Sequence, residues 1–155
     1  MAKIKIYFED PYSFELANVT PLMGIVGLYF IFLTTTEIPY PFRKSRLLYI
    51  GMSEKKTNSI GSRLAGHFDG QSGNVGLLNY RKIESLNFTY INFEMLKKVW
   101  NHRIEDLESY FILDFVKHYG VYPICNNKTG FEILTSNLEV NLEIDWRYFE
   151  KGLVR

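Results

Sequence analysis

The spacing of hydrophobic residues predicts several strands. Gly27 to Leu33 is an apolar run rich in aromatic and β-branched residues, which indicates a buried strand. Arg46 to Met52 predicts a second strand, and the two would pair as a hairpin with a long connection. Lys3 to Phe8 alternates charged and apolar residues, as an edge strand does, and Phe88 to Leu96 alternates well enough to predict a further strand.

Other segments repeat apolar residues at helical spacing. The clearest is Ile104 to Tyr119. Its apolar stripe consists of Ile104, Leu107, Phe111, Ile112 and Phe115. A second helix is predicted to run to Phe68, with Asn58 or Ser59 as its N-cap. Val75 to Ile83 predicts a short third helix.

The connecting segments carry loop signals. Thr34 to Arg46 contains two prolines and three basic residues, and Asp69 to Gly76 contains three glycines, so both are predicted as loops. Pro123 to Gly130 is a further predicted loop, whereas Leu138 to Leu153 mixes strand and helix signals.

The order of these elements favours an α/β (α+β) fold in which helices flank a small, central, mostly antiparallel β-sheet. The chain has 155 residues, enough for one domain with a substantial core and too few for two ordinary ones. We therefore expect residues 1–155 to form a single domain.

Composition and charge limit the partners that the protein can have. The chain is 46% hydrophobic and contains 12 Phe and 11 Tyr, which is a globular composition. Its net charge is only +1, so it lacks the overall basicity of a protein that coats nucleic acid. Any contact with nucleic acid must come from a local patch with a small footprint.

Cysteine usage and hydropathy favour an intracellular, cytoplasmic protein. Cys125 is the single cysteine, which rules out an intrachain disulfide and a cysteine-rich zinc module. The first ten residues are too polar for a secretory leader. The most apolar run, Leu22 to Leu33, is shorter than the roughly 20 residues that cross a bilayer. We therefore expect no association with a membrane.

Four residues supply chemistry suited to the hydrolysis of a phosphodiester. Tyr29 and Tyr49 lie on the two strands predicted to pair, and each can relay a proton through its phenol. Arg63 lies on the next predicted helix and can hold an anionic phosphorus centre. Glu108 lies on the last long helix and can hold a divalent metal.

The order and spacing of these residues resemble the GIY-YIG nuclease superfamily. Five motifs appear in order over residues 27–126, the motif core of the predicted domain. They are Gly27-Leu28-Tyr29, Tyr49-Ile50-Gly51-Met52-Ser53, Arg63-Leu64-Ala65-Gly66-His67-Phe68, Leu107-Glu108-Ser109-Tyr110-Phe111-Ile112 and Pro123-Ile124-Cys125-Asn126. Two features depart from the family pattern: leucine replaces isoleucine in the first motif, and the basic loop 34–46 lengthens the segment between the two strands.

The resemblance implies an endonuclease that uses one metal ion per active site, Mg²⁺ or Mn²⁺, held by Glu108. Water would attack the phosphorus in line, with its proton taken directly or by relay by a tyrosine, Tyr29 in the first instance. Arg63 would offset charge on the pentacovalent phosphorus. The products would carry 5′-phosphate and 3′-hydroxyl ends.

Each candidate residue also has a structural interpretation. Glu108 could pack its stem against the core and extend its carboxylate into water. Arg63 could form a surface ion pair, and both tyrosines could be core rings. His67 could bond within the site, assist proton transfer or simply be packed. Asn126 could orient the backbone or the substrate, or could cap a loop.

Double-stranded DNA is the expected partner, and local basic residues would have to bind it. The candidates are Arg43, Lys44, Arg46, Lys55, Lys56, Arg81 and Lys82. Within the nuclease interpretation, a compact restriction-type enzyme, assisted by a possible homodimer, competes with repair and homing roles. The alternative from another class is a non-catalytic nucleic-acid-binding module on the same fold.

Overall fold

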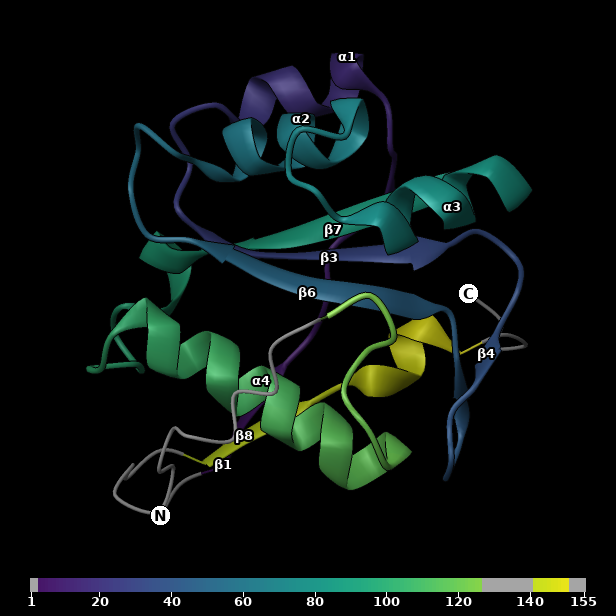
Figure 1. Ribbon diagram of the computed structural model, residues 1–155. Coiled ribbons are helices and arrows are strands. Elements are labelled where there is room, and N and C mark those ends of the chain that lie inside the picture. The colour runs from purple at the N-terminus through teal and green to yellow at the C-terminus, as the bar shows by residue number, and fades with distance from the viewer. Residues whose placement is uncertain (1–2, 127–140, 151–155) are drawn as a thin grey trace.

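A four-stranded sheet separates two layers of helices and short elements (Figure 1). The computed structural model describes residues 3–126 and 141–150. The strand order is β2 (Tyr12–Ser13), β7 (Leu86–Asn92), β3 (Gly27–Leu33) and β6 (Leu47–Ser53), and every neighbouring pair is antiparallel. The predicted α+β class and the predicted pairing of β3 with β6 are both confirmed.

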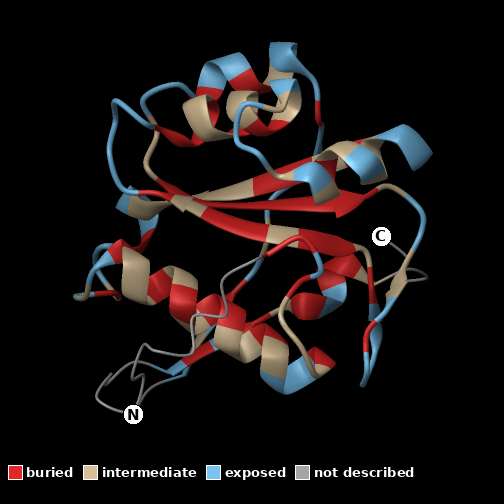
Figure 2. Ribbon diagram, viewed as in Figure 1, coloured by how far each residue is buried: buried red, intermediate tan, exposed pale blue. Residues whose placement is uncertain are grey.

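Strand β3 lies in the interior of the sheet, and all seven of its residues are buried (Figure 2). Side chains of a strand alternate between its two faces. Leu28, Phe30 and Phe32 therefore face one layer of the protein, while Tyr29, Ile31 and Leu33 face the other. This double burial explains why the β3 sequence is continuously apolar rather than alternating.

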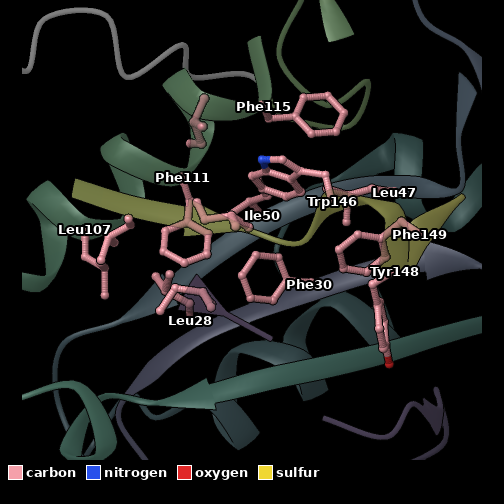
Figure 3. Close-up of a cluster of buried hydrophobic side chains, with 14 of the residues drawn as sticks. Leu28, Phe30, Leu47, Ile50, Leu107, Phe111, Phe115, Trp146, Tyr148 and Phe149 are labelled. Atoms are coloured by element: carbon pink, nitrogen blue, oxygen red, sulfur yellow. The ribbon is translucent and has the colours of Figure 1, made fainter. Parts of the chain in front are cut away.

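The first layer packs around helix α4 (Ile104–Tyr119), whose predicted bounds are confirmed. Its other elements are β1 (Lys3–Ile6), η2 (Phe93–Leu96), β8 (Asn141–Ile144) and η4 (Trp146–Phe149). Figure 3 shows aromatic rings from α4 and η4 meeting the Phe30 ring of β3. The Phe30 ring lies 5.7 Å from that of Phe111 and 6.1 Å from that of Phe149.

The second layer covers the opposite face of the sheet (Figure 1). It consists of α1 (Leu16–Val19), η1 (Thr20–Leu22), α2 (Ile60–Asp69) and α3 (Val75–Ile83). The Ser59 hydroxyl accepts a hydrogen bond from the Ser62 amide, so the predicted N-cap of α2 is confirmed. Helix α2 is the element that brings polar side chains to this face of the sheet.

Three parts of the chain differ from the sequence-based expectation. The strand at Lys3 pairs in parallel with β8, so it lies outside the four-stranded sheet. The end of the predicted third strand, Phe93–Leu96, is a 3₁₀ helix because the Asn92 side chain caps it at Glu94. The predicted loop 34–46 contains a small hairpin, β4 (Ile38–Pro39) with β5 (Lys44–Ser45). The remainder of the predicted loop 123–130, and parts of the segment 138–153, lie outside the described residues.

Two charged side chains fix the connection between β3 and β6. The Glu84 carboxylate accepts bonds from the Thr35 and Thr36 amides and from the hydroxyls of Thr34–Thr36. These bonds lower the pKa of Glu84 to about 2, although desolvation acts in the opposite direction. The Arg46 guanidinium donates to the carbonyls of Leu33, Thr34 and Tyr148. The connection is therefore held at both ends.

Across the parts of the chain that the structure describes, no helix combines the length and the apolar character needed to cross a bilayer.

The close approach of β3 to β7 generates a stability prediction. A Cβ added at Gly27 would lie 1.9 Å from the Ile91 carbonyl oxygen, which is main chain and cannot rotate away. Gly27→Ala should therefore lower the free energy of unfolding by about 3 kcal/mol, measured by urea denaturation. The matched control is Gly66→Ala within α2, where a Cβ meets nothing closer than 3.9 Å. The control should be neutral or stabilising by up to about 1 kcal/mol. Equal effects of the two substitutions would contradict this account.

Candidate active site

A cavity of about 480 Å³ opens beside the edge strand β6. Side chains from both layers reach it, because β6 has a sheet neighbour on one side only. The polar side chains along its wall include Tyr49, Asn58, Arg63, His67, Gln71, Ser72, Asn74, Glu108 and Asn126. The cavity therefore contains five of the six site residues predicted from the sequence.

The sixth, Tyr29, lies directly beneath the cavity wall and is completely buried. Its hydroxyl lies 2.9 Å from Nε2 of His67, and it accepts a longer bond of 3.4 Å from Nε of Arg63. Arg63 and His67 are four residues apart on α2 and share one face of the helix. A single buried phenol therefore connects the sheet to both Arg63 and His67 of that helix.

Gly51 makes this arrangement possible. It lies opposite Tyr29 in the pairing of β3 with β6, so the Tyr29 ring crosses its position. A Cβ added at Gly51 would lie 2.3 Å from Cζ of Tyr29 and 2.5 Å from its hydroxyl oxygen. The glycine of the Tyr49-Ile50-Gly51 motif thus permits the ring of Tyr29 to extend toward α2.

His67 is held between Tyr29 and the loop that follows α2. Its Nδ1 lies 2.7 Å from the Ser72 hydroxyl, while Nε2 contacts the Tyr29 hydroxyl. Burial lowers the pKa of His67 to about 4, and the nearby charge of Arg63 acts in the same direction. The imidazole is therefore neutral at pH 7. In the tautomer protonated at Nδ1, which can donate to Ser72, Nε2 is free to accept a proton from Tyr29.

Burial raises the pKa of both tyrosines. For Tyr29 the ionised form of Tyr49 raises the pKa further, whereas Arg63 lowers it. For Tyr49 the next contribution is the charge of Glu108, which also raises the pKa. The Tyr49 ring lies 6.0 Å from the Tyr29 ring and 5.0 Å from the imidazole of His67. Both phenols are protonated in the free protein, so neither is a base without assistance.

Glu108 approaches the cavity from α4, in the layer opposite to α2. It is partly buried, and its charge acts on both Tyr49 and Arg63. Within residues 3–126 and 141–150, no three His, Cys, Asp or Glu side chains converge to hold a metal alone. A single carboxylate nevertheless suits Mg²⁺, which keeps several waters and completes its coordination with substrate phosphate oxygens. Glu108 fits this mode of binding.

Asn126 has a structural role. Its side-chain oxygen accepts from the Ile50 amide at 3.0 Å, and its side-chain nitrogen donates to the Ile50 carbonyl at 2.8 Å. The Cys125 amide likewise donates to the Leu48 carbonyl. The chain after α4 thus occupies the free edge of β6 as a strand would. Of the roles open to Asn126, orienting the backbone of β6 is the one that its contacts show.

Sequence reasoning missed the contribution of the loop Gly70–Asn74. Ser72 contacts His67, and Asn74 caps α3 through a bond from the Leu77 amide. The available signal was the spacing of glycines: Gly70 and Gly73 have φ angles of 87° and 76°, values that favour glycine. Glycine content indicated a loop but not its position against the cavity.

The predicted DNA-binding residues separate into two groups. Lys55 lines a small hollow with Met52, Glu54, Asn58 and Arg63, next to the main cavity. Lys56 follows it in the chain and is exposed. Lys55 therefore lies beside the site, and a role of these two residues in binding a polyanion stays a prediction.

The other predicted cations are placed differently. Arg46 is held by main-chain carbonyls, and Arg81 donates to the Phe68 carbonyl while stacking 4.2 Å from the Phe68 ring. Both guanidiniums thus support the fold. Lys82 is exposed on α3, and Lys44 is exposed on β5. Arg43 lies near the C-terminal end of α4, where the neighbouring Phe42 amide donates to the Tyr119 carbonyl.

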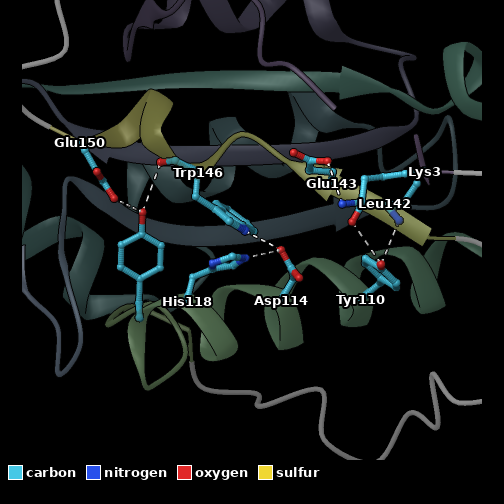
Figure 4. A network of polar contacts seen from close by, with 9 residues as sticks. Lys3, Tyr110, Asp114, His118, Leu142, Glu143, Trp146 and Glu150 are labelled. Carbon is cyan, nitrogen blue, oxygen red and sulfur yellow. Dashed lines mark hydrogen bonds and ion pairs between the residues drawn. The ribbon is translucent and has the colours of Figure 1, made fainter. Parts of the chain in front are cut away.

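This end of α4 carries a second cavity, of about 620 Å³, most of whose charges are paired. Arg43 bonds to Glu150 at 2.7 Å, and Lys3 lies 3.4 Å from Glu143. Figure 4 shows Asp114 between His118 and the indole of Trp146. Tyr119 lies eleven residues beyond Glu108, or about 16 Å along the helix. The expectation that the basic loop emerges beside the active face is therefore wrong for Arg43.

No family model matches this chain, no curated protein matches it, and no solved structure matches it.

The low pKa of His67 generates a prediction on stability and pH. Well above pH 6.5 the imidazole is neutral in both the folded and the unfolded state, so it contributes no pH dependence. Between pH 6.5 and pH 4 the unfolded chain binds a proton that the folded protein does not, so the free energy of unfolding falls. The loss from this group should be about 2 kcal/mol between pH 7 and pH 5.

Urea denaturation at both pH values, on the unaltered protein and on His67→Gln, measures this loss. The variant should lose about 2 kcal/mol less than the unaltered protein over the same interval. Identical pH dependence in the two proteins would show that His67 titrates normally.

Proposed function

We propose that this protein is a metal-dependent endonuclease of the GIY-YIG type, which hydrolyses DNA to 5′-phosphate and 3′-hydroxyl ends. The observation that carries the proposal is the convergence of Tyr29, Tyr49, Arg63, His67 and Glu108 at one cavity. These residues come from four elements and are spread over 80 positions of the chain. A guanidinium, a carboxylate and coupled proton-transfer groups together suit an anionic ester.

Glu108 would hold one Mg²⁺ or Mn²⁺ at the cavity. When bound, the metal would stabilise the developing charge on the leaving 3′-oxygen. Arg63 is partly exposed on the cavity wall, where its guanidinium can hold the non-bridging oxygens of the phosphate.

The proton path follows from the bonds of Tyr29. Its raised pKa means that it cannot act alone as a base at neutral pH. Because its hydroxyl is completely buried and does not line the cavity, it would receive the water's proton by relay through Tyr49, which lines the cavity and is hydrogen-bonded to it, as its own proton passes to Nε2 of His67, 2.9 Å away. The neutral state of His67 at pH 7 leaves that nitrogen available, and Ser72 can accept a bond from the opposite nitrogen.

The alternative is a binding module without catalytic activity. Such a module would need the cationic residues at the cavity but neither the carboxylate of Glu108 nor a proton path from Tyr29 to His67. A carboxylate facing the binding site also repels phosphate. The presence of both the Glu108 carboxylate and the proton path to His67 favours hydrolysis. A restriction-type role, with a possible homodimer to cut both strands, is the proposed biological context.

Removal of the Glu108 carboxylate tests the proposal. Glu108→Gln retains shape but weakens metal binding, so cleavage of mixed plasmid DNA with Mg²⁺ or Mn²⁺ should fall by about 10²-fold or more. Melting temperature and DNA binding should persist. The matched control is Glu105→Gln on the same helix, where the side chain is 41% exposed and pairs with Arg103. The control should cleave like the unaltered protein, and near-normal cleavage by Glu108→Gln would overturn the assignment.

The placement of the cations generates a second prediction. Replacing Lys55 and Lys56 together by Ala should weaken DNA binding and make the log–log salt dependence shallower by about one unit per lost phosphate contact. The matched control replaces Arg43 and Lys44 by Ala, which changes net charge equally at the far end of α4. Fluorescence anisotropy over a range of salt concentrations measures both slopes. Equal slopes for the two double variants would place the DNA elsewhere.

A further inference from the structure

The loop between α2 and α3 forms one wall of the cavity and is held rigidly. The Ser72 amide donates to the Gly66 carbonyl at 3.1 Å, and the Gly73 amide donates to the Gly70 carbonyl at 3.2 Å. The Asn74 side chain accepts a hydrogen bond from the Leu77 amide and donates one to the Cys125 carbonyl. The loop therefore presents its exposed side chains from a fixed backbone.

Nearly all polar side chains of this loop are used to hold it. Asp69 accepts from the Gln71 amide, and the Ser72 hydroxyl contacts both His67 and the Asn74 amide. The side chain of Gln71 is the exception: it lines the cavity, is exposed, and bonds to none of the described residues. A carboxamide held over the site by a rigid loop, with its donor and acceptor both available, is equipped to bind a ligand.

The cavity wall combines two kinds of chemistry. Arg63, Glu108 and Tyr49 offer charge and proton transfer, which suit a phosphate and a metal. Gln71 and Asn58 offer neutral amides; the Asn58 side chain likewise bonds to none of the residues that the structure describes. A nucleotide has the same division, because a charged phosphate adjoins a neutral base with donors and acceptors on its edge.

We propose that Gln71 is a specificity-determining residue that reads the edge of a base next to the scissile phosphate, with a preference for adenine. This inference rests on the proposed function. A glutamine amide donates to N7 and accepts from N6 of adenine in the major groove, a pairing that no other base offers in the same geometry. The loop backbone keeps Gln71 at the cavity that Arg63 and Glu108 also line, so its amide can reach only bases near the scissile phosphate. The protein should therefore recognise the base at one position relative to the bond that it cleaves.

The test separates binding from cleavage. Glu108→Gln protein, with Mg²⁺ present, is incubated with a pool of DNA duplexes randomised at every position, and the bound fraction is sequenced. The same selection is made with Gln71→Ala and with Gln71→Glu, each in the Glu108→Gln background. The matched control is Asn79→Ala in that background, since Asn79 is exposed on α3 and outside the cavity.

Adenine should be enriched at one position for the Glu108→Gln and control proteins. Gln71→Ala should reduce this enrichment by about 5- to 150-fold, the range for loss of a bidentate base contact. Gln71→Glu should move the preference toward cytosine, because a carboxylate accepts from the cytosine N4 amino group. The backbone bonds of the loop are unchanged in both variants, so the fold should be retained.

Adenine enrichment that is absent, or that survives Gln71→Ala unchanged, overturns the inference. The proposed function is judged separately, by cleavage with the unaltered protein. Cleavage without Gln71-dependent enrichment of adenine would support the nuclease assignment and contradict the role of Gln71. Gln71-dependent enrichment without cleavage would retain base reading in a binding module and remove the nuclease.

Discussion

Burial of the Tyr29 hydroxyl is the constraint on which the site depends. Strand β3 is enclosed on both faces, so every side chain that it carries must be satisfied inside the protein. For six of its residues apolar packing is sufficient. For Tyr29 the phenol needs polar partners, and α2 supplies them as Arg63 and His67, one helical turn apart. The same bonds that remove the cost of burying the phenol orient the two side chains that face the cavity. Gly51 has no Cβ, and that space lets the ring reach them.

The edge of the sheet explains how residues from opposite layers meet. Arg63 lies on α2 and Glu108 on α4, and in the middle of the sheet the strands would separate them. At β6 the sheet ends, so both can reach one cavity. An exposed strand edge is a liability, because its unpaired amides and carbonyls invite pairing with another chain. Asn126 and the Cys125 amide occupy part of that edge through Ile50 and Leu48, which keeps the backbone of the Tyr49-Ile50-Gly51 motif in place.

Local patterns predicted the elements better than their long-range partners. The bounds of β3, α3 and α4 follow from runs and stripes within the elements themselves, and the Ser59 cap follows from one hydroxyl at a helix start. The meeting of Tyr29 with Arg63 and His67 follows from strand pairing and helical spacing. The position of Asn126 does not, because its bonds join residues 76 positions apart. The parallel pairing of β1 with β8 joins opposite ends of the chain. The alternation of polar and apolar residues in either strand does not indicate which strand is its partner.

Charge was the least predictable property, because a basic residue looks the same in the sequence whether it is solvated or buried in contacts. Arg46 and Arg81 are occupied by carbonyls and aromatic rings, and Arg43 is neutralised by Glu150. A protein with a net charge of +1 attracts DNA weakly as a whole, so its positive residues matter only where they are not already compensated. Lys55, Lys56 and Arg63 lie on the chain from β6 to α2, where Glu54 shares the small hollow with Lys55 and Arg63. Under the proposed function, so few phosphate contacts would give little affinity by themselves, and discrimination would have to come from base contacts. A neutral amide beside the proposed phosphate site would then contribute more to selectivity than another cation would.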